Sequence, residues 1–211
     1  MLRKYKSSGF KRILPVLCYL QVSFLPWPLE VRAGNMGIFE KAQSRTVNLE
    51  ATYLLHFLKM VRWSDKDLPA EDKPVKCLIV GQDKTSFLDR FSFLVSESNT
   101  TISARKITVH GVEKMKDALL LAQKNKDVVL VVALEAVAGE WEKSMYPKRS
   151  GLLVYGQSEK FIQQGVAVFS IMSRNRVKIS VNLRKTKAVG LTVSPELLIQ
   201  DRIFFVDKKE E

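Results

Sequence analysis

Cysteine and histidine are scarce in this chain, with two residues of each among 211. His56 and His110 stand far apart, and neither has a further histidine, a cysteine or a carboxylate pair at the spacing of metal ligands. We therefore expect each histidine to be buried or to cap an element. The sequence predicts no metal site and little acid–base chemistry near neutral pH.

Motifs that bind phosphate or carry a nucleophile are also lacking. The sequence has no G-x-S-x-G elbow, no G-x-G-x-x-G fingerprint and no G-x-x-x-x-G-K-[ST] loop. The nearest candidate is the turn Gly81–Ser86, in which Asp83 would repel an anion. We expect an ordinary turn in which Asp83 or Thr85 caps the next helix. The sequence thus predicts no enzymatic activity and no cofactor.

A long uninterrupted apolar run is absent as well. Residues 1–33 instead have the order of a secretory signal peptide, with a basic stretch, the apolar run Ile13–Leu25 and Val31-Arg32-Ala33 before Gly34. Prolines and polar residues interrupt the run, so it is a poor transmembrane helix. We expect cleavage after Ala33 and an exported protein that is not itself transmembrane. The alternative is that this segment stays as an anchor.

The net charge of +12 is partly carried by that segment. Six of the 34 basic residues and one of the 22 acidic residues lie in residues 1–33, which leaves +7 for the remainder. Export and this moderate charge argue against nucleic acid as a partner. Removal of Cys18 leaves Cys77 alone, inside the apolar run Val75–Val80, so we expect a buried thiol and no intramolecular disulfide.

Hydrophobic periodicity predicts an α/β fold. A helical pattern begins at Asn48, the expected N-cap, and ends near Trp63. After a polar loop, apolar runs alternate with helical patterns, which is typical of βα units and a largely parallel sheet. The expected strands are 76–81, 104–109, 128–133 and 151–155, and the expected helices are 85–95, 112–123, 135–145 and 159–164.

The C-terminal part has a different pattern. The apolar runs 167–172 and 177–182 are separated by only four residues, too few for a parallel crossover, so we expect an antiparallel hairpin. A short helix should follow and stop at Gly190, and a last helix should open at Ser194. The predicted fold class is a three-layer Rossmann-like α/β domain with a mostly parallel sheet, this hairpin and flanking helices.

These patterns divide the chain into a signal peptide (1–33), an N-terminal extension (34–47) and one α/β domain (48–207). Two basic clusters could form a binding surface: the helix end Lys59–Trp63, and the wider cluster around the hairpin. Our candidate partner-binding residues are Arg174, Arg176, Lys178, Arg184 and Trp63.

The order of these elements resembles the YfiR family of periplasmic regulators. The resemblance is carried by ATYLLHFLKMVRW, CLIVG, VVLVV, LLVYGQSEKFIQQGVAV and, most specifically, RVKISVNLRKTKAVGLTVSPELL. It extends from about Asn48 to Gln200. Two features depart from the family pattern: Gly165-Val166 and Phe169-Ser170 replace Gly-Gly and Asn-Phe, and the additional cysteines of some members are missing.

The resemblance implies a non-enzymatic protein that binds the periplasmic domain of an inner-membrane diguanylate cyclase. By holding the cyclase inactive, it would lower cyclic di-GMP signalling and restrain biofilm formation. The resemblance also implies a homodimer. From the fold alone, the alternative is a periplasmic receptor that binds a small ligand at the carboxyl ends of the strands.

Overall fold

A computed structural model describes residues 30–140, 149–158, 161, 168–173, 176–198 and 203–205. The helices are α1 (Glu30–Met60), α2 (Phe87–Glu97), α3 (Met115–Lys124), α5 (Leu183–Ala188) and α6 (Pro195–Leu198), with 3-10 turns at Asp65–Asp67 and Glu135–Val137. The strands are β1 (Val61–Arg62), β2 (Val75–Val80), β3 (Thr101–Ile102), β4 (Arg105–Val112), β5 (Val128–Ala133), β6 (Leu153–Gly156), β7 (Val168–Ser173), β8 (Arg176–Val181), β9 (Thr192–Val193) and β10 (Ile203–Phe205).

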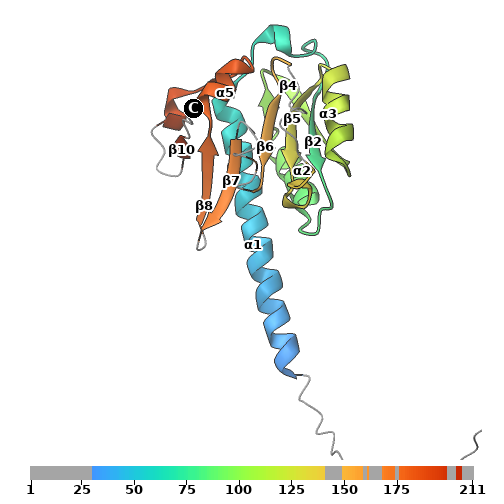
Figure 1. Cartoon of the computed structure of the whole chain (residues 1–211), viewed down its shortest axis with the longest axis vertical. Coiled ribbons are helices and arrows are strands. Elements are labelled where there is room, and N and C mark those ends of the chain that lie inside the picture. Colours follow the sequence, from blue (N-terminus) through green and yellow to red (C-terminus); the bar gives the residue numbers. More distant parts are fainter. Residues whose placement is uncertain are drawn as a thin grey trace, which may run out of the picture.

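Eight strands of the described residues form one sheet in the order β10-β8-β7-β6-β5-β2-β4-β3, and β1 pairs separately with β9 (Figure 1). The neighbours from β4 through β2, β5 and β6 to β7 are parallel, as expected for strands that are joined by crossovers. β7 and β8 form the predicted antiparallel hairpin, with Val168 opposite Val181 and Ser173 opposite Arg176. The predicted α/β fold class is confirmed.

Helices cover both faces of the sheet, which gives a three-layer structure with one hydrophobic cluster on each face. On one face, α1 and α2 pack over alternate residues of β2 and β5, and Leu54, Phe87 and Phe91 are fully buried there. On the other face, Met115 and Leu119 of α3 pack over the remaining strand residues. Strands that are buried on both faces read as continuous apolar runs, which is why β2 and β5 stand out in the sequence.

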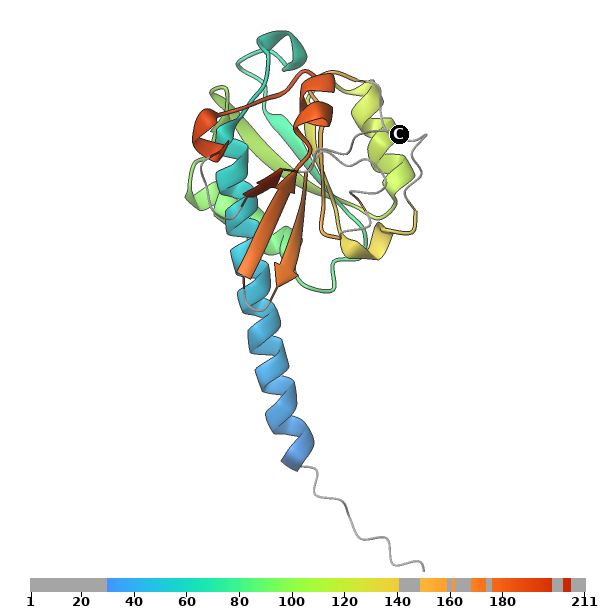
Figure 2. The ribbon, with the colours of Figure 1, turned by 60° about the vertical axis from the view of Figure 1, so that its left-hand side comes forward.

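α1 differs from the sequence prediction because it begins at Glu30, well before Asn48. Asn48 is therefore inside the helix, where its backbone carbonyl accepts a hydrogen bond from Thr52 Oγ1. The described burial on this helix starts at Val47. Its N-terminal half extends beyond the sheet, as Figures 1 and 2 show. Among the described residues, no helix has the length and apolarity that crossing a membrane requires.

The C-terminal elements follow the sequence prediction closely. α5 begins after Asn182, whose side-chain Oδ1 accepts a hydrogen bond from the backbone N–H of Lys185. It ends before Gly190, which has a φ of +75° that favours glycine. β9 then returns to β1, and α6 opens at Pro195 after Ser194. Of the predicted helix 135–145, the described part contains the 3-10 turn Glu135–Val137.

Candidate partner-binding surface

The strand β8 and the helix α5 hold three of the five residues that the sequence singled out. Arg176 and Lys178 occupy alternate positions of β8, in register with Ser173 and Ile171 of β7. Arg184 lies on α5 and is exposed. Arg174, the fourth, falls outside the described residues.

The structure separates the predicted basic cluster into two parts. Arg176 opens β8, whereas Arg184 follows the end of that strand. A six-residue strand spans roughly 20 Å. Figure 1 accordingly shows the start of β8 and the helix α5 at opposite ends of that strand. We call the first part, Arg176 and Lys178, the hairpin cluster, and we treat Arg184 as a separate position.

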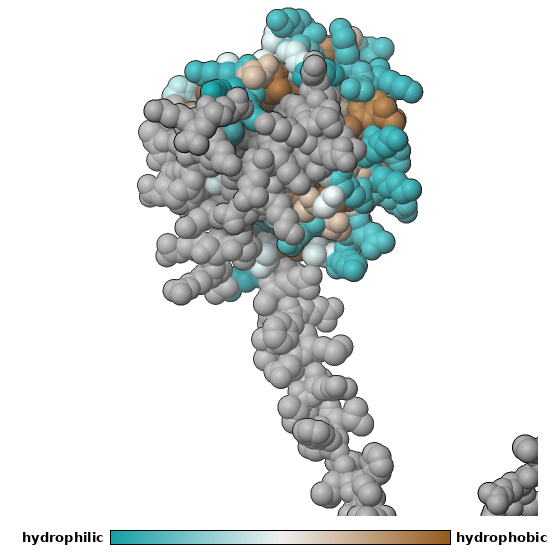
Figure 3. All heavy atoms as spheres, in the orientation of Figure 1, coloured by the Kyte–Doolittle hydropathy of each residue, from teal (hydrophilic) through white to brown (hydrophobic). Residues whose placement is uncertain are grey.

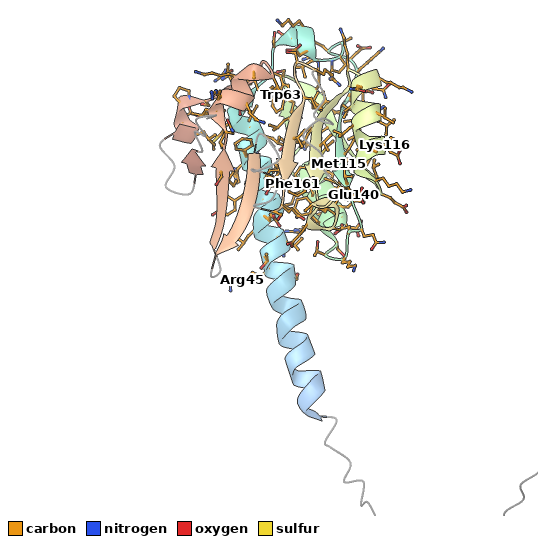
Figure 4. All side chains as sticks on the ribbon, in the orientation of Figure 1. Arg45, Trp63, Met115, Lys116, Glu140 and Phe161 are labelled. Atoms are coloured by element: carbon orange, nitrogen blue, oxygen red, sulfur yellow. The ribbon has the colours of Figure 1, made fainter. Side chains whose placement is uncertain are left out.

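Trp63 is buried and not on the surface. Its side chain is 7% exposed, and its indole Nε1 donates a 3.0 Å hydrogen bond to the backbone carbonyl oxygen of Gly151. The backbone N–H of Gly151 in turn donates to the carbonyl oxygen of Val189, at the end of α5. Trp63, labelled in Figure 4, therefore joins β1, α5 and the turn before β6, and it has little surface to offer a partner.

The turn Gly81–Ser86 has the capping role that the sequence predicted. Asp83 Oδ1 accepts hydrogen bonds from the backbone N–H of Thr85 and of Phe87, and Oδ2 accepts one from Leu88. Because Asp83 occupies the first N–H groups of α2, the helix terminus offers few donors to a phosphate. This turn acts as a helix cap.

A groove of about 460 Å³ lies beside this turn, between α1 and α2. Its lining includes Asn48 from α1, Lys84 from the turn, and Arg90 and Phe93 from α2. The guanidinium carbon of Arg90 lies 5.3 Å from the centre of the Phe93 ring, and Phe93 is 52% exposed. The volume of the groove lies within the range of small-ligand pockets, and the groove opens near the carboxyl ends of the strands.

The candidate catalytic groups are placed as follows. Cys77 lies in β2 with 1% exposure, and burial raises the pKa of its thiol far above the usual range. A thiol with a raised pKa is a poor nucleophile, which agrees with the predicted packing role. The described residues contain no group of three or more potential metal ligands.

The prediction that both histidines are buried or act as caps was wrong. His56 and His110 are exposed, and His110 Nε2 lies 3.2 Å from Thr108 Oγ1 on the same strand. His56 lies on the outer side of α1. Its neighbours Leu55 and Phe57 are buried and face the core. The apolar residues around it in the sequence therefore belong to the other face of the helix.

One polar contact was not predicted. Glu50 of α1 is 9% exposed, and its Oε2 accepts a 3.1 Å hydrogen bond from Gln157 Nε2, just after β6. The two residues are 107 positions apart, so no local pattern indicates the pair. A second long-range contact is made by Glu140, which accepts a hydrogen bond from the backbone N–H of Met115 and caps α3 (Figure 4).

Two solved structures resemble the chain in part. One is the ABC domain in complex with L-Trp from Streptococcus pneumonia, at 7% identity and a TM-score of 0.48, covering 72% of this chain and 60% of that one. The other is a conserved domain protein from Vibrio cholerae O1 biovar eltor, at 11% identity and the same TM-score, covering 75% and 59%. The chain thus spans about 60% of the length of either structure. None of the curated proteins matches this sequence.

The family comparison covers most of the chain. The YfiR/HmsC-like family matches residues 47–199, a span from the buried part of α1 to the end of α6. Members of this family are periplasmic regulators of diguanylate cyclases. The chain therefore belongs to the YfiR/HmsC-like family.

Proposed function

We propose that this protein binds the periplasmic domain of an inner-membrane diguanylate cyclase and holds the enzyme inactive, which lowers cyclic di-GMP. The observation that carries the proposal is the family match over residues 47–199, which includes every described strand of the sheet except β10. The buried Cys77, with its raised thiol pKa, and the capping role of Asp83 support a binding function over a catalytic one. The regulator would act as a dimer of two identical chains.

The proposed mechanism is differential affinity. A regulator can shift a two-state equilibrium only by as much as its affinity for the two states differs. A hundredfold preference for the inactive cyclase corresponds to about 2.7 kcal/mol. An interface of ordinary size can supply this difference without any chemical step.

The proposed domain organisation follows from export. Residues 1–33 would direct the chain to the periplasm and be removed after Ala33, residues 34–47 would form an extension, and residues 48–207 would form the regulatory domain. The helix α1 starts at Glu30, so the proposed cleavage lies in its first turn. N-terminal sequencing of the protein from the cell envelope tests this organisation, and an intact Met1 would contradict it.

A gene deletion tests the regulatory function. When the gene for this protein is deleted, cells that express a partner cyclase should contain more cyclic di-GMP and attach more strongly. A plasmid-borne copy of the gene should return cyclic di-GMP and attachment to the wild-type level. The matched control is a strain that lacks the cyclase gene. Deletion of the gene for this protein in that strain should leave cyclic di-GMP unchanged. Unchanged cyclic di-GMP in the single deletion, with the cyclase shown to be present, would contradict the proposal.

The groove between α1 and α2 supports a second candidate, a receptor for a small ligand. Its lining combines the cations Lys84 and Arg90 and the acid Asp89 with an exposed aromatic ring, a combination that suits a ligand with a ring and polar groups. A ligand that binds the native state raises the melting temperature. A thermal-shift screen that finds such a ligand, with the shift abolished by Arg90→Gln, would favour this function over the first.

A further inference from the structure

We propose that the open edge of β4 is a strand-addition site for an extended, acidic segment of another protein. The inference goes beyond the proposed function and does not depend on it. It rests on the pairing of β4, the two grooves beside the strand and the charges at its ends.

The outer edge of β4 is unpaired over most of its length. β2 pairs with residues 107–112 on the inner side, from Val75 opposite Ile107 to Val80 opposite Val112. On the outer side, β3 pairs with only Arg105 and Lys106. No other strand among the described residues lies along β4. Six consecutive residues thus have an open side, which is the template that strand addition uses.

The backbone groups that face the open side can be identified. Gly81 donates a 2.9 Å hydrogen bond to the carbonyl oxygen of Val112, so Val112 directs its backbone towards β2. Because this direction alternates along a strand, Ile107, Val109 and Gly111 direct their N–H and C=O groups outward. These three residues offer six groups to an incoming strand.

A groove lies on each face of this edge. The groove on the α2 side measures about 400 Å³, and Val95, Ile107 and Val109 contribute its apolar lining. The groove on the α3 side measures about 250 Å³ and includes Leu78 and Leu121. An added strand points alternate side chains to opposite faces, so both grooves would receive them.

The α3 side also exposes apolar surface. Leu120 and Leu121 are 43% and 42% exposed, and Figure 3 shows a hydrophobic patch on the side of the molecule that carries α3. Proline and lysine usually keep an edge strand from pairing with another chain. The open stretch 107–112 contains neither residue. This edge is therefore unusually accessible for pairing.

A second copy of this chain fits the edge poorly. Antiparallel pairing about a twofold axis centred on Val109 would set Val112 of the second copy beside Lys106, a place that Thr101 of β3 already holds. Pairing centred on His110 would likewise bring Lys114 of the second copy to the place beside Lys106 that Thr101 holds, and would set two lysines against each other. Like charges directly opposite one another destabilise a strand pair.

The same charges favour an acidic partner. Lys106 precedes the open stretch and Lys114 follows it, next to Glu113, and all three residues are exposed. A carboxylate at either end of an incoming segment would meet a cation there. The site therefore fits an extended segment with apolar residues inside and an acidic residue at each end.

Peptide binding tests the site on the mature protein. The probe is acetyl-Asp-Val-Thr-Val-Thr-Val-Asp-amide, and its control has lysine at both ends. At saturation with the acidic peptide, amide hydrogen exchange measured by NMR should slow at least tenfold at Ile107, Val109 and Gly111. Thr108 and His110, whose amides face β2, should change little. The lysine peptide should bind at least tenfold more weakly in low salt.

Two variants locate the binding. Val109→Pro removes an outward N–H, and Val109→Lys places a charge in the α2-side groove. Each should abolish binding of the acidic peptide, with circular dichroism and a melting curve verifying the fold. Absence of exchange protection in the wild type, or equal binding of both peptides, would overturn the proposal. Protection of the same amides that grows with protein concentration in the absence of peptide would also overturn it, in favour of a second copy.

Discussion

The indole of Trp63 and the backbone carbonyl of Gly151 are joined by a hydrogen bond of 3.0 Å across 88 positions of sequence. This bond holds the end of α1 and β1 against the turn before β6. Nearby, Ser150 Oγ donates a hydrogen bond to Asp67 Oδ2. The two contacts together hold the loops at the end of the sheet next to α5. The region is a structural junction, so changes there should affect stability more than partner binding.

Trp63→Phe should destabilise the protein by about 1–3 kcal/mol, because the buried carbonyl of Gly151 loses its donor. Urea unfolding followed by circular dichroism measures the change. Arg62→Ala is a matched control, since Arg62 is the exposed residue directly before Trp63, at the end of β1, and its loss should cost less than about 0.5 kcal/mol. A Trp63→Phe variant with wild-type stability but lost partner binding would show that this side chain contacts the partner.

Cys77 should contribute packing and no redox control. Cys77→Ser should cost on the order of 1–3 kcal/mol, because a hydroxyl enters an apolar site, whereas Cys77→Ala should retain regulation. Burial raises the pKa of the thiol, so it stays protonated at pH 8 and should react with a thiol reagent such as DTNB only after unfolding. Rapid reaction in the native protein would contradict this placement.

Asp83→Ala should destabilise α2 by about 0.5–2 kcal/mol, because the N–H groups of Phe87 and Leu88 lose their acceptor. Asp89→Ala is the control, because Asp89 is an exposed acid in the first turn of the same helix and accepts none of the capping hydrogen bonds. Thermal unfolding of the two variants gives the comparison. Equal losses would mean that the helix dipole matters here and the side-chain cap does not.

Gly156→Ala should destabilise the end of β6, because an added Cβ would overlap Cγ, Cδ2 and Cβ of Phe161. Phe161 is fully buried, so the ring cannot move out, and we expect a cost of about 1–3 kcal/mol. Phe161→Ala removes the Cγ and Cδ2 atoms that the new methyl group meets, so the double mutant should lose less stability than the sum of the two single variants. An additive loss in the double mutant would show that the two sites do not contact each other.

The sequence predicted the elements whose evidence is local. β5 is a run of buried apolar residues, and Asn182 and Gly190 mark the two ends of α5 by their own chemistry. The early start of α1 was missed because Asn48 looks like a cap, yet the helix passes through it. β1 and β9 are two residues long and exist only because each pairs with the other, so neither has a detectable period.

The candidate site shows the same limit. Trp63 is the last residue of the helical pattern, so the sequence indicated an exposed helix end. No residue nearby in the sequence indicates its hydrogen bond to Gly151. The basic residues of the hairpin and of α5 are adjacent in sequence, but the length of β8 separates Arg176 from Arg184. The open edge of β4 depends on the order of strands in the sheet, which the sequence pattern leaves undetermined.

The hairpin cluster gives the last prediction. Arg176→Glu with Lys178→Glu should slow association with the periplasmic domain of the partner cyclase, because these positions would meet an acidic surface. The loss should be about tenfold or more at 20 mM salt and much smaller at 500 mM, since the Debye length falls from roughly 20 Å to about 4 Å. Stopped-flow or surface plasmon resonance at the two salt concentrations measures both rates.

Two controls make this prediction specific. Arg184→Glu tests the separate position beyond β8, and Lys124→Glu changes an exposed cation at the end of α3, which packs against β2, β4 and β5. If the hairpin cluster forms the rim of the interface, its double reversal lowers the association rate, Lys124→Glu does not, and Arg184→Glu shows whether the interface reaches α5. Effects in proportion to the charge removed, with the double reversal lowering the logarithm of the rate about twice as much as either single reversal, would mean that the cyclase responds to net charge alone, because long-range attraction depends on the total charge and a rim contact depends on position.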